Sequence, residues 1–379
     1  MSIETKMILF LLTFLCLYSG INFYLFFRAK SILHFSGLLQ GLILILVILL
    51  ILAPIIVRTL ESLHYEQLAR LTACVGYVWM AFVFLFFFSS ISLELIRIVL
   101  KLIVPGTGAL TLKAVTFYVS ILLAVGLVVY GYFDAQLIRV KNLQITTDQV
   151  LPEDGKLRIV QISDVHVGII IRNSRLNQIL ERIQEAHPDI LVSTGDLLDG
   201  ELDNIKEDAK RFAAIKVPYG KFAVLGNHEY YAGLKRSIEF TEAAGFHLLR
   251  DDSIRAAGIT IFGEDDITGR KPSETKKSEA LQKALTRKTD GFVLLLKHQP
   301  SVSKEACFNL QLSGHTHGGQ LFPFGLVTRL FFPKNYGLHE LAANKLLYVS
   351  RGTGTWGPPV RVFAPPEITV IDLIGKKMN

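Results

Sequence analysis

The distribution of apolar residues divides the chain near residue 135. Before that point, four long apolar runs lie at about residues 7–27, 37–57, 72–96 and 114–133. A membrane-spanning helix needs about 20 mostly apolar residues, so each run is long enough to cross a bilayer. Beyond that point, the apolar runs are short and alternate with polar residues. The pattern therefore predicts a transmembrane region of four helices over residues 1–137 and a globular domain over residues 138–379.

The first apolar run has a second interpretation, which is a cleaved signal peptide. No small-residue cleavage site follows it and three more apolar runs do, so we favour a multi-pass membrane protein. Four spans place both chain ends on one side of the membrane. The flanking basic residues divide evenly between the two sides, as Lys6, Arg58, Arg70, Arg139 and Lys141 against Arg28, Lys30, Arg97, Lys101 and Lys113. The positive-inside rule therefore leaves the side of the globular domain undetermined.

Past residue 138, short apolar strands alternate with amphipathic helical patterns, which predicts a layered α/β domain. The expected strands are 157–163, 189–194, 221–225, 259–263, 292–297, 309–313, 346–350 and 367–373. The expected helices are 174–187, 204–214, 233–245 and 274–288. Ser174 is expected to be the N-cap of the first of these helices.

The composition agrees with a membrane protein and leaves the class of partner open. Half of the residues are hydrophobic and the mean hydropathy is +0.39, too apolar for an ordinary soluble protein. The net charge of +7 suits nucleic acid, anionic lipid or a phosphorylated substrate, and charge alone does not choose among them. Cys16 and Cys74 lie in apolar runs and Cys307 is alone in the globular part, which excludes a disulfide framework there.

Side chains that can bind metal ions follow five of the expected strands. The five segments are Asp164-Val165-His166, Gly195-Asp196-Leu197-Leu198-Asp199, Gly226-Asn227-His228-Glu229, His298 and Gly314-His315-Thr316-His317. Active sites of open α/β sheets lie at the carboxyl ends of the strands. Residues that are far apart in the sequence can therefore converge at one edge of the predicted domain.

Each of these segments taken alone is weak, because a histidine beside glycine is more often a polar turn or a core residue than a metal ligand. Together they favour a shared metal site, because all five follow apolar strands and all supply carboxylate, amide or imidazole groups. This set suits borderline divalent ions such as Mn, Fe or Zn. Two such ions about 3.5–4 Å apart hold the oxygens of a phosphate and lower the pKa of a bound water, whose hydroxide can attack phosphorus.

In order and in residue type, the five segments resemble the signature of the calcineurin-like metallophosphoesterases. The resemblance runs from about Leu157 to the C-terminus, and the runs "GHTHGGQ" and "PPEITVIDL" are most similar to the bacterial membrane-associated branch. It implies a layered α/β/β/α domain with the metals at the strand-end loops, preceded here by the four transmembrane helices. It also implies a multi-pass protein of the bacterial inner membrane.

The resemblance further implies two divalent metal ions and a ligand set for each. The first ion would be bound by Asp164, His166 and His317, the second by Asn227, His298 and His315, and both by Asp196. His228 would act near the leaving-group oxygen as general acid or transition-state stabiliser, and Asp199 would orient it. Glu229 stays open between a role in the site and a simple helix-start carboxylate.

The substrate is less well indicated, because this family includes monoesterases, diesterases, nucleases and pyrophosphatases. The segment 321–337 carries several Phe and Leu residues together with Arg329 and Lys334. It could pack against its own domain, or it could touch the bilayer and admit a lipid-linked phosphate. Arg351 and Arg361 are either ordinary surface arginines or contacts for phosphate oxygens.

We therefore predict a membrane-bound, dinuclear-metal-dependent phosphoesterase that hydrolyses a lipid-linked phosphodiester or pyrophosphate by attack of a metal-bound hydroxide. Its partners would be the lipid bilayer and that phosphorylated substrate, and no specific nucleic acid is predicted. One alternative is a tethered phosphodiesterase or nuclease of broad specificity, and another is a UDP-2,3-diacylglucosamine pyrophosphatase of lipid A synthesis. A metal-binding scaffold is a third, and the intact Asp199–His228 pair argues against it.

Overall fold

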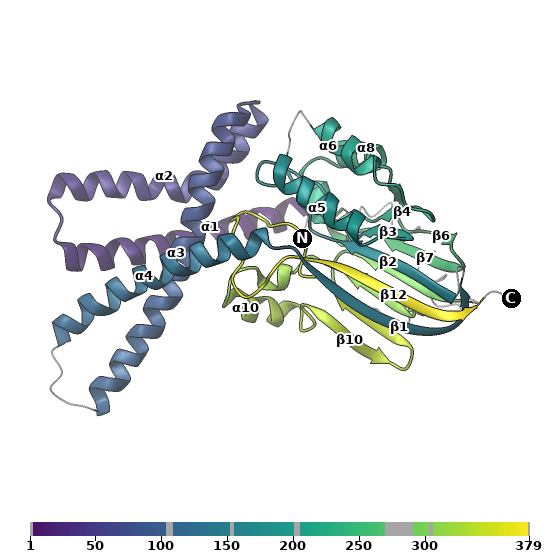
Figure 1. Ribbon diagram of the computed structural model, residues 1–379. Helices are drawn as coiled ribbons and strands as arrows, with labels where there is room; N and C mark the ends of the chain where they lie inside the picture. The colour runs from purple at the N-terminus through teal and green to yellow at the C-terminus, as the bar shows by residue number, and fades with distance from the viewer. Residues whose placement is uncertain are drawn as a thin grey trace. The chain divides into compact units, whose positions relative to one another are not determined.

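The computed structural model of the protein describes residues 3–103, 109–151, 155–200, 205–269, 291–302 and 306–377 (Figure 1). The chain forms two compact units. One consists of Met1–Phe133 with Gly357–Val362, and the other of Asp134–Trp356 with Phe363–Asn379. The expected helix over 274–288 lies outside the described residues.

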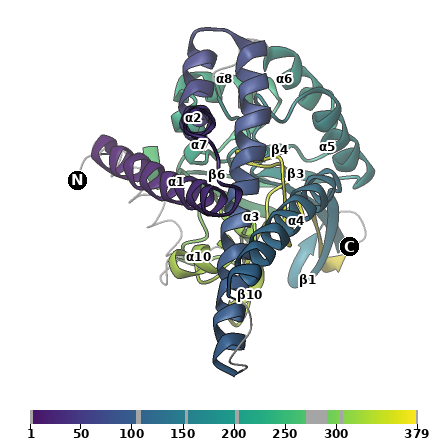
Figure 2. The ribbon, with the colours of Figure 1, turned by 90° about the vertical axis from the view of Figure 1, so that its left-hand side faces the viewer.

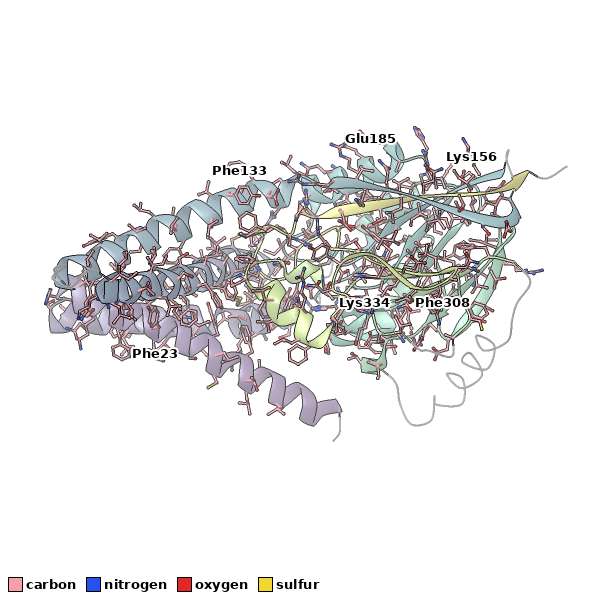
Figure 3. The ribbon with its side chains drawn as sticks, turned by 90° about the horizontal axis from the view of Figure 1, so that it is seen from below. Phe23, Phe133, Lys156, Glu185, Phe308 and Lys334 are labelled. Atoms are coloured by element: carbon pink, nitrogen blue, oxygen red, sulfur yellow. The ribbon has the colours of Figure 1, made fainter. Side chains whose placement is uncertain are left out.

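The first unit contains four long helices, which Figure 2 shows from a second direction. They are α1 (Ile3–Leu33), α2 (Gly37–Ser62), α3 (Glu66–Ile103) and α4 (Ala109–Gln136). All four are long and apolar enough to cross a membrane, which confirms the four predicted apolar helices. Many large apolar side chains project outward from them, including Phe133, which is 63% exposed and labelled in Figure 3. Such a surface suits contact with lipid rather than with water.

Polar side chains inside this unit link its helices. The indole N–H of Trp79 on α3 donates to Asn22 Oδ1 on α1, with 2.8 Å between the nitrogen and the oxygen. Arg28 on α1 forms an ion pair with Glu94 on α3, and Glu94 also accepts a hydrogen bond of 2.8 Å from Thr116 on α4. Interhelical hydrogen bonds of this kind stabilise helix association where no hydrophobic driving force exists.

The second unit contains two six-stranded sheets. The first has the strand order β1-β12-β2-β3-β4-β5, in which only the β12–β2 pair is antiparallel. Its strands are β1 (Arg139–Leu151), β2 (Lys156–Ile162), β3 (Ile190–Ser193), β4 (Lys221–Ala223), β5 (His247–Leu248) and β12 (Glu367–Lys377). Strands β2, β3 and β4 therefore end on the same edge of the sheet.

The second sheet has the strand order β10-β11-β9-β8-β7-β6, with a parallel centre and an antiparallel strand at each edge. Its strands are β6 (Asp252–Ala256), β7 (Ile259–Glu264), β8 (Val293–Lys297), β9 (Leu310–Ser313), β10 (Gly337–Ala342) and β11 (Lys345–Val349). All eight expected strands are present, as β2, β3, β4, β7, β8, β9, β11 and β12. The prediction of a mixed α/β domain behind four apolar helices is confirmed.

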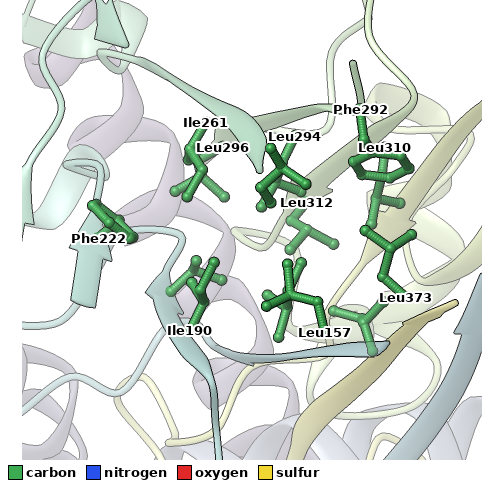
Figure 4. Packing of buried hydrophobic residues seen from close by; sticks show 14 of the residues in the cluster. Leu157, Ile190, Phe222, Ile261, Phe292, Leu294, Leu296, Leu310, Leu312 and Leu373 are labelled. Atoms are coloured by element: carbon green, nitrogen blue, oxygen red, sulfur yellow. The ribbon is translucent and has the colours of Figure 1, made fainter. Parts of the chain in front are cut away.

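The main hydrophobic core lies between the two sheets. Side chains of the first sheet, such as Leu157 and Ile190, pack against side chains of the second, such as Leu294 and Leu312 (Figure 4). These residues alternate along their strands with residues that face the other side of each sheet, as the two-residue period of a strand requires. The opposed sheets form a rigid base for the loops at the strand ends.

Helices complete the second unit. They are α5 (Asn173–Glu185), α6 (Ile205–Ala213), α7 (Asn227–Tyr231), α8 (Leu234–Ala243) and α10 (Phe324–Phe331), with short 3-10 turns η2 (Ile267–Gly269) and η4 (His317–Gly319). Figure 1 shows α5, α6 and α8 together on one side of the first sheet.

The prediction that Ser174 is the N-cap of the first helix is wrong. The cap position is occupied by Arg172, and Ser174 lies inside α5. The helix begins at Asn173, one residue earlier than predicted, and the φ of Asn173 is 44°, a left-handed value that asparagine tolerates better than most residues. Arg175 on the same helix donates hydrogen bonds to the carbonyls of Ala135 and Gln136, at 2.5 and 2.7 Å, and so caps the end of α4.

Candidate active site

The five polar segments predicted from the sequence all follow strands that the structure contains. Asp164 and His166 follow β2, Asp196 and Asp199 follow β3, and Asn227 and His228 begin α7 after β4. In the second sheet, His298 follows β8, while His315 and His317 follow β9. The two sheets thus contribute to one group of side chains, because the core holds their strand ends together.

Five of these residues have a left-handed backbone conformation, which the sequence did not predict. Their φ angles are 51° at Asp164, 54° at His166, 52° at Asp196, 72° at His315 and 49° at His317. Such conformations are strained for residues other than glycine and persist only where the surrounding structure imposes them. Their concentration in these loops is typical of a functional site.

Backbone hydrogen bonds hold the strained loops in place. The N–H of His166 donates to the carbonyl of Asp196 at 3.0 Å, and the N–H of Gly354 donates to the carbonyl of Asp164 at 3.0 Å. Gly314 is required by close approach, since a Cβ there would lie 2.2 Å from Asp164 Oδ2. The loops after β2, β3 and β9 therefore fix one another.

A first group of possible metal ligands consists of Asp164, His166 and His317. The Nε2 atoms of His166 and His317 are 3.1 Å apart, and His317 Nε2 is 3.4 Å from Asp164 Oδ1. Asp164 is held by Ser163, whose hydroxyl donates to Oδ2 at 2.5 Å, and by the backbone N–H of His315. The group therefore presents two imidazole nitrogens and a carboxylate oxygen to a common point.

A second group consists of Asp196, His298 and His315, with Asn227 beside them. Asn227 Oδ1 is 3.1 Å from His298 Nε2 and 2.9 Å from His315 Nδ1. Asp196 Oδ2 is 3.2 Å from His298 Nε2 in this group and 3.9 Å from His166 Nε2 in the first. Asp196 is thus the carboxylate that reaches both groups.

The orientation and charge of these residues fit divalent metal ions. His298 Nδ1 donates to the carbonyl of Thr194 at 2.8 Å, which turns Nε2 toward the group, where it would bind a metal ion after losing its proton. Burial lowers the pKa of His166 to about 3 and that of His315 to about 4, so both imidazoles are neutral, as metal ligands must be.

The carboxylates of the site favour a nearby positive charge. Burial raises the pKa of Asp164 to about 6, and the negative charge of Asp196 adds to that rise. Burial alone would lower the pKa of His298, but Asp196 and Asp164 raise it well above its usual value. The negative charge of these buried carboxylates, which holds a proton on His298, would also be offset by bound metal cations.

His228 and Asp199 form a pair at the side of the two groups. His228 Nδ1 is 3.1 Å from Asp199 Oδ1, and the backbone N–H of His228 donates to Asp196 Oδ1 at 2.9 Å. Burial alone would lower the pKa of His228, but the charges of Asp196 and Asp199 raise it above its usual value. The structure therefore favours a protonated imidazole whose Nδ1 is engaged, which leaves Nε2 available.

Glu229, which the sequence left open, is a buried anchor of the site loops. Its carboxylate accepts four backbone hydrogen bonds, from Gly226, Asp196, Leu197 and Leu198, at 2.6–3.1 Å. Burial, with the charge of Asp196, raises its pKa to about 7. Glu229 thus joins the loop after β3 to the loop after β4 and positions the residues that the two loops carry.

We expect Glu229→Gln to lower activity by about 10–100-fold, as outer partners of metal ligands typically do. The glutamine NH2 would face a backbone N–H, and a buried unpaired donor costs about 1–3 kcal/mol of stability. Both effects are measurable on the detergent-solubilised full chain, by hydrolysis rate and by thermal unfolding. Glu239→Gln is the matched control, because Glu239 is 66% exposed on α8 and should change neither quantity. Wild-type activity and stability of Glu229→Gln would contradict the anchoring role.

Two aromatic residues at the site were not predicted from the sequence. The rings of Tyr231 and Trp356 both contact the imidazole of His228. The available signal was that Trp356 is one of only two tryptophans in the chain and lies in the run "RGTGTWGPP". The two arginines near this run, Arg351 and Arg361, lie in different environments. Arg361 is fully buried in the unit of the four helices, whereas the Arg351 guanidinium lies 4.4 Å from the ring centre of Tyr336.

The segment 321–337 contains a short helix, α10, beside the candidate site. It begins five residues after the end of η4, and a Cβ on Gly319 would lie 2.2 Å from Gly325 Cα, so the two turns pack closely. None of the eight residues of α10 is buried, and Leu330 and Phe331 are 80% and 76% exposed. The residues of α10 therefore lie outside the domain's core, although the helix packs against η4. Lys334, labelled in Figure 3, follows the helix.

Comparisons with known proteins agree with this geometry. A family model described as calcineurin-like phosphoesterase matches residues 157–319, which contain all the predicted metal ligands and the His228–Asp199 pair. An uncharacterized metallophosphoesterase from Aquifex aeolicus is 39% identical over 258 residues, which cover 67% of this chain and 98% of that protein.

Two further relatives are longer than the region they share with this chain. An uncharacterized metallophosphoesterase from Helicobacter pylori is 32% identical over 63% of this chain and 64% of that protein. A protein from Danio rerio named as a transmembrane protein with metallophosphoesterase domain is 31% identical over 67% of this chain and 62% of that protein. The chain therefore spans less than two thirds of the length of either relative.

Proposed function

Because the chain belongs to the calcineurin-like metallophosphoesterase family, we propose that it is a membrane-bound enzyme with two metal ions that cleaves a lipid-linked phosphodiester or pyrophosphate. Metal-dependent hydrolysis of phosphoesters follows from membership of the family. The observation that carries the two-metal proposal is the position of Asp196 Oδ2, which lies 3.2 Å from His298 Nε2 of the second group and 3.9 Å from His166 Nε2 of the first.

The proposed ligand sets follow the two groups. Asp164, His166 and His317 would hold the first ion, Asn227, His298 and His315 the second, and Asp196 would hold both. Manganese, iron and zinc suit this mixture of carboxylate, amide and imidazole ligands. When bound, two such ions polarise the phosphate and activate water for attack on phosphorus.

The residues of the chain then orient the substrate and move one proton. The imidazolium of His228 donates the Nε2 proton to the leaving-group oxygen as the bond between phosphorus and that oxygen breaks. Asp199 accepts from Nδ1 and so fixes the ring with Nε2 toward the substrate. The same carboxylate stabilises the positive charge of the imidazolium before transfer.

The lipid-linked part of the proposal is supported by α10. Its exposed apolar side chains, with Arg329 and Lys334 beside them, suit the boundary between acyl chains and anionic head groups. The chain also carries four candidate membrane spans, which would keep the second unit tethered to a bilayer. The proposed location is the inner membrane of a bacterium, for which the four candidate spans and the bacterial source of two relatives are the only support.

We expect the double variant Leu330→Glu with Phe331→Glu to lose about tenfold in hydrolysis of lipid-linked substrate in vesicles, because two side chains would no longer enter the interface. Hydrolysis of a soluble chromogenic phosphodiester should be unchanged. The measurement is product analysis after incubation with total lipid extract and manganese. Leu330→Ile with Phe331→Leu is the matched control and should match the wild type. Equal loss on both substrates in the double Glu variant would count against the membrane role of α10, and wild-type inactivity on every phosphodiester would count against the function itself.

A further inference from the structure

His228 lies in contact with two aromatic rings from different parts of the second unit. The ring centres of Tyr231 and Trp356 are each 5.5 Å from the centre of the imidazole, at interplanar angles of 74° and 73°. Tyr231 is the last residue of α7, and Trp356 lies in the segment after β11. Both rings therefore adjoin the side chain that we propose protonates the leaving-group oxygen.

Both rings are exposed although their neighbour is buried. Tyr231 and Trp356 are 46% and 44% exposed, whereas His228 is 7% exposed. Large aromatic side chains usually bury most of their surface, because it is the main source of their stabilising contacts. Two exposed rings on one buried imidazole leave aromatic surface available to a ligand at that histidine.

The position of Trp356 is fixed by the same loop that carries His317. The side chain of Gln320 makes two hydrogen bonds to the backbone of Trp356: its Nε2 donates to the carbonyl at 2.9 Å, and its Oε1 accepts from the N–H at 3.0 Å. Gln320 is itself 9% exposed and directly follows η4. The indole is thus held at the site by the candidate metal-binding loop and is not a side chain of an independent surface segment.

We propose that Tyr231 and Trp356 form an aromatic subsite for a ring carried by the leaving group, either a nucleobase or a sugar. The flat or weakly polar face of such a ring stacks on an aromatic side chain, whereas an open-chain alcohol such as glycerol has no such face. The inference rests on the proposed function, in which His228 protonates the leaving-group oxygen. It narrows the substrate to one that joins a lipid and a ring-bearing group through phosphate.

The first experiment measures ligand binding without catalysis. In a Trp79→Phe background of the full chain in detergent, Trp356 is the only tryptophan and reports on the subsite by fluorescence. The probes are uridine 5′-monophosphate, glucose 1-phosphate and glycerol 3-phosphate. We expect at least one ring-bearing probe to change the Trp356 fluorescence and to bind about tenfold more tightly than glycerol 3-phosphate. Binding of uridine 5′-monophosphate alone indicates a nucleoside, and binding of glucose 1-phosphate alone indicates a hexose.

The second experiment uses calorimetry on variants of the two rings. Trp356→Leu and Tyr231→Leu should each remove most of the preference for the ring-bearing probe and leave the affinity for glycerol 3-phosphate unchanged. Trp356→Phe and Tyr231→Phe keep an aromatic ring and should keep most of the preference. The comparison of Leu and Phe variants separates stacking from a structural role. Loss of a structural role would weaken the binding of all three probes alike.

Three results would overturn the subsite. The first is equal affinity of the wild type for all three probes, and the second is unchanged Trp356 fluorescence with every probe. The third is an equal loss of affinity for all three probes in Trp356→Leu. None of them bears on the proposed function, whose own test is hydrolysis of a phosphodiester by the wild type and its loss in Asp196→Asn. An enzyme that passes that test and shows no ring preference contradicts the subsite alone.

Discussion

Asp196→Asn is expected to abolish phosphoesterase activity, with a loss of about a thousandfold or more. Asp196 Oδ2 is the carboxylate oxygen near both ligand groups, at 3.2 Å from His298 Nε2 and 3.9 Å from His166 Nε2. Asparagine keeps the size of the side chain but removes the charge that offsets repulsion between two bound cations. Metal ions contribute several kcal/mol to such reactions, and about 1.4 kcal/mol corresponds to a tenfold change in rate.

Metal content and rate should change together in this variant. After dialysis against a metal-free buffer, we expect the wild type to keep close to two metal ions per chain and Asp196→Asn to keep fewer. Asp372→Asn is the matched control, because Asp372 forms a half-exposed ion pair with Arg158 at 2.7 Å on β12. Such pairs contribute at most about 1 kcal/mol, so activity and metal content should be unchanged. Full activity of Asp196→Asn would contradict the bridging role.

His228→Asn is expected to lower the hydrolysis rate by about 10²–10⁴-fold while metal content stays that of the wild type. The Nε2 proton of His228 would no longer be available to the leaving-group oxygen. The loss should depend on the substrate, because an alkoxide leaving group needs that proton more than p-nitrophenolate does. The measurement is the rate ratio of wild type to variant for an alkyl and an aryl phosphodiester, with metal content determined in parallel.

Two further variants test whether the loss in His228→Asn comes from the missing general acid. Asp199→Asn should give a smaller loss with the same dependence on leaving group, because Asp199 acts through His228. His187→Asn is the matched control: His187 is exposed, and its φ of 47° is one that asparagine adopts readily. If His228→Asn loses activity equally on the alkyl and aryl substrates, or loses its metal ions, His228 acts as a structural or ligating residue and not as the general acid.

These two predictions involve residues that the sequence could identify for a physical reason. Asp196 and His228 directly follow buried strands, and buried strands show as continuous apolar runs. The strand pattern located the loops, and the residue types in the loops indicated metal chemistry. The loops alone do not distinguish Asp196 from Asp164 as the carboxylate near both ligand groups, and that prediction came from the family resemblance.

The strands that the sequence missed share one position in the fold. They are β1, β5, β6 and β10, the four edge strands of the two sheets. An edge strand has a neighbouring strand along one edge only, and it is less buried than a central strand. Its sequence therefore contains fewer apolar residues. The pattern along β10, where partly buried and exposed residues alternate, illustrates this. Helix α10 was missed for a related reason, since none of its residues faces the core of its own domain.

The sequence by itself determined the four apolar helices, the eight central strands and the candidate ligands, because burial and ligand chemistry are properties of residue type and order. Only the tertiary structure decided the left-handed loops, the four hydrogen bonds to Glu229 and the contact of Tyr231 and Trp356 with His228. These depend on which strand ends meet when two sheets pack face to face. Contacts between distant segments are set by that packing, and no local pattern records them.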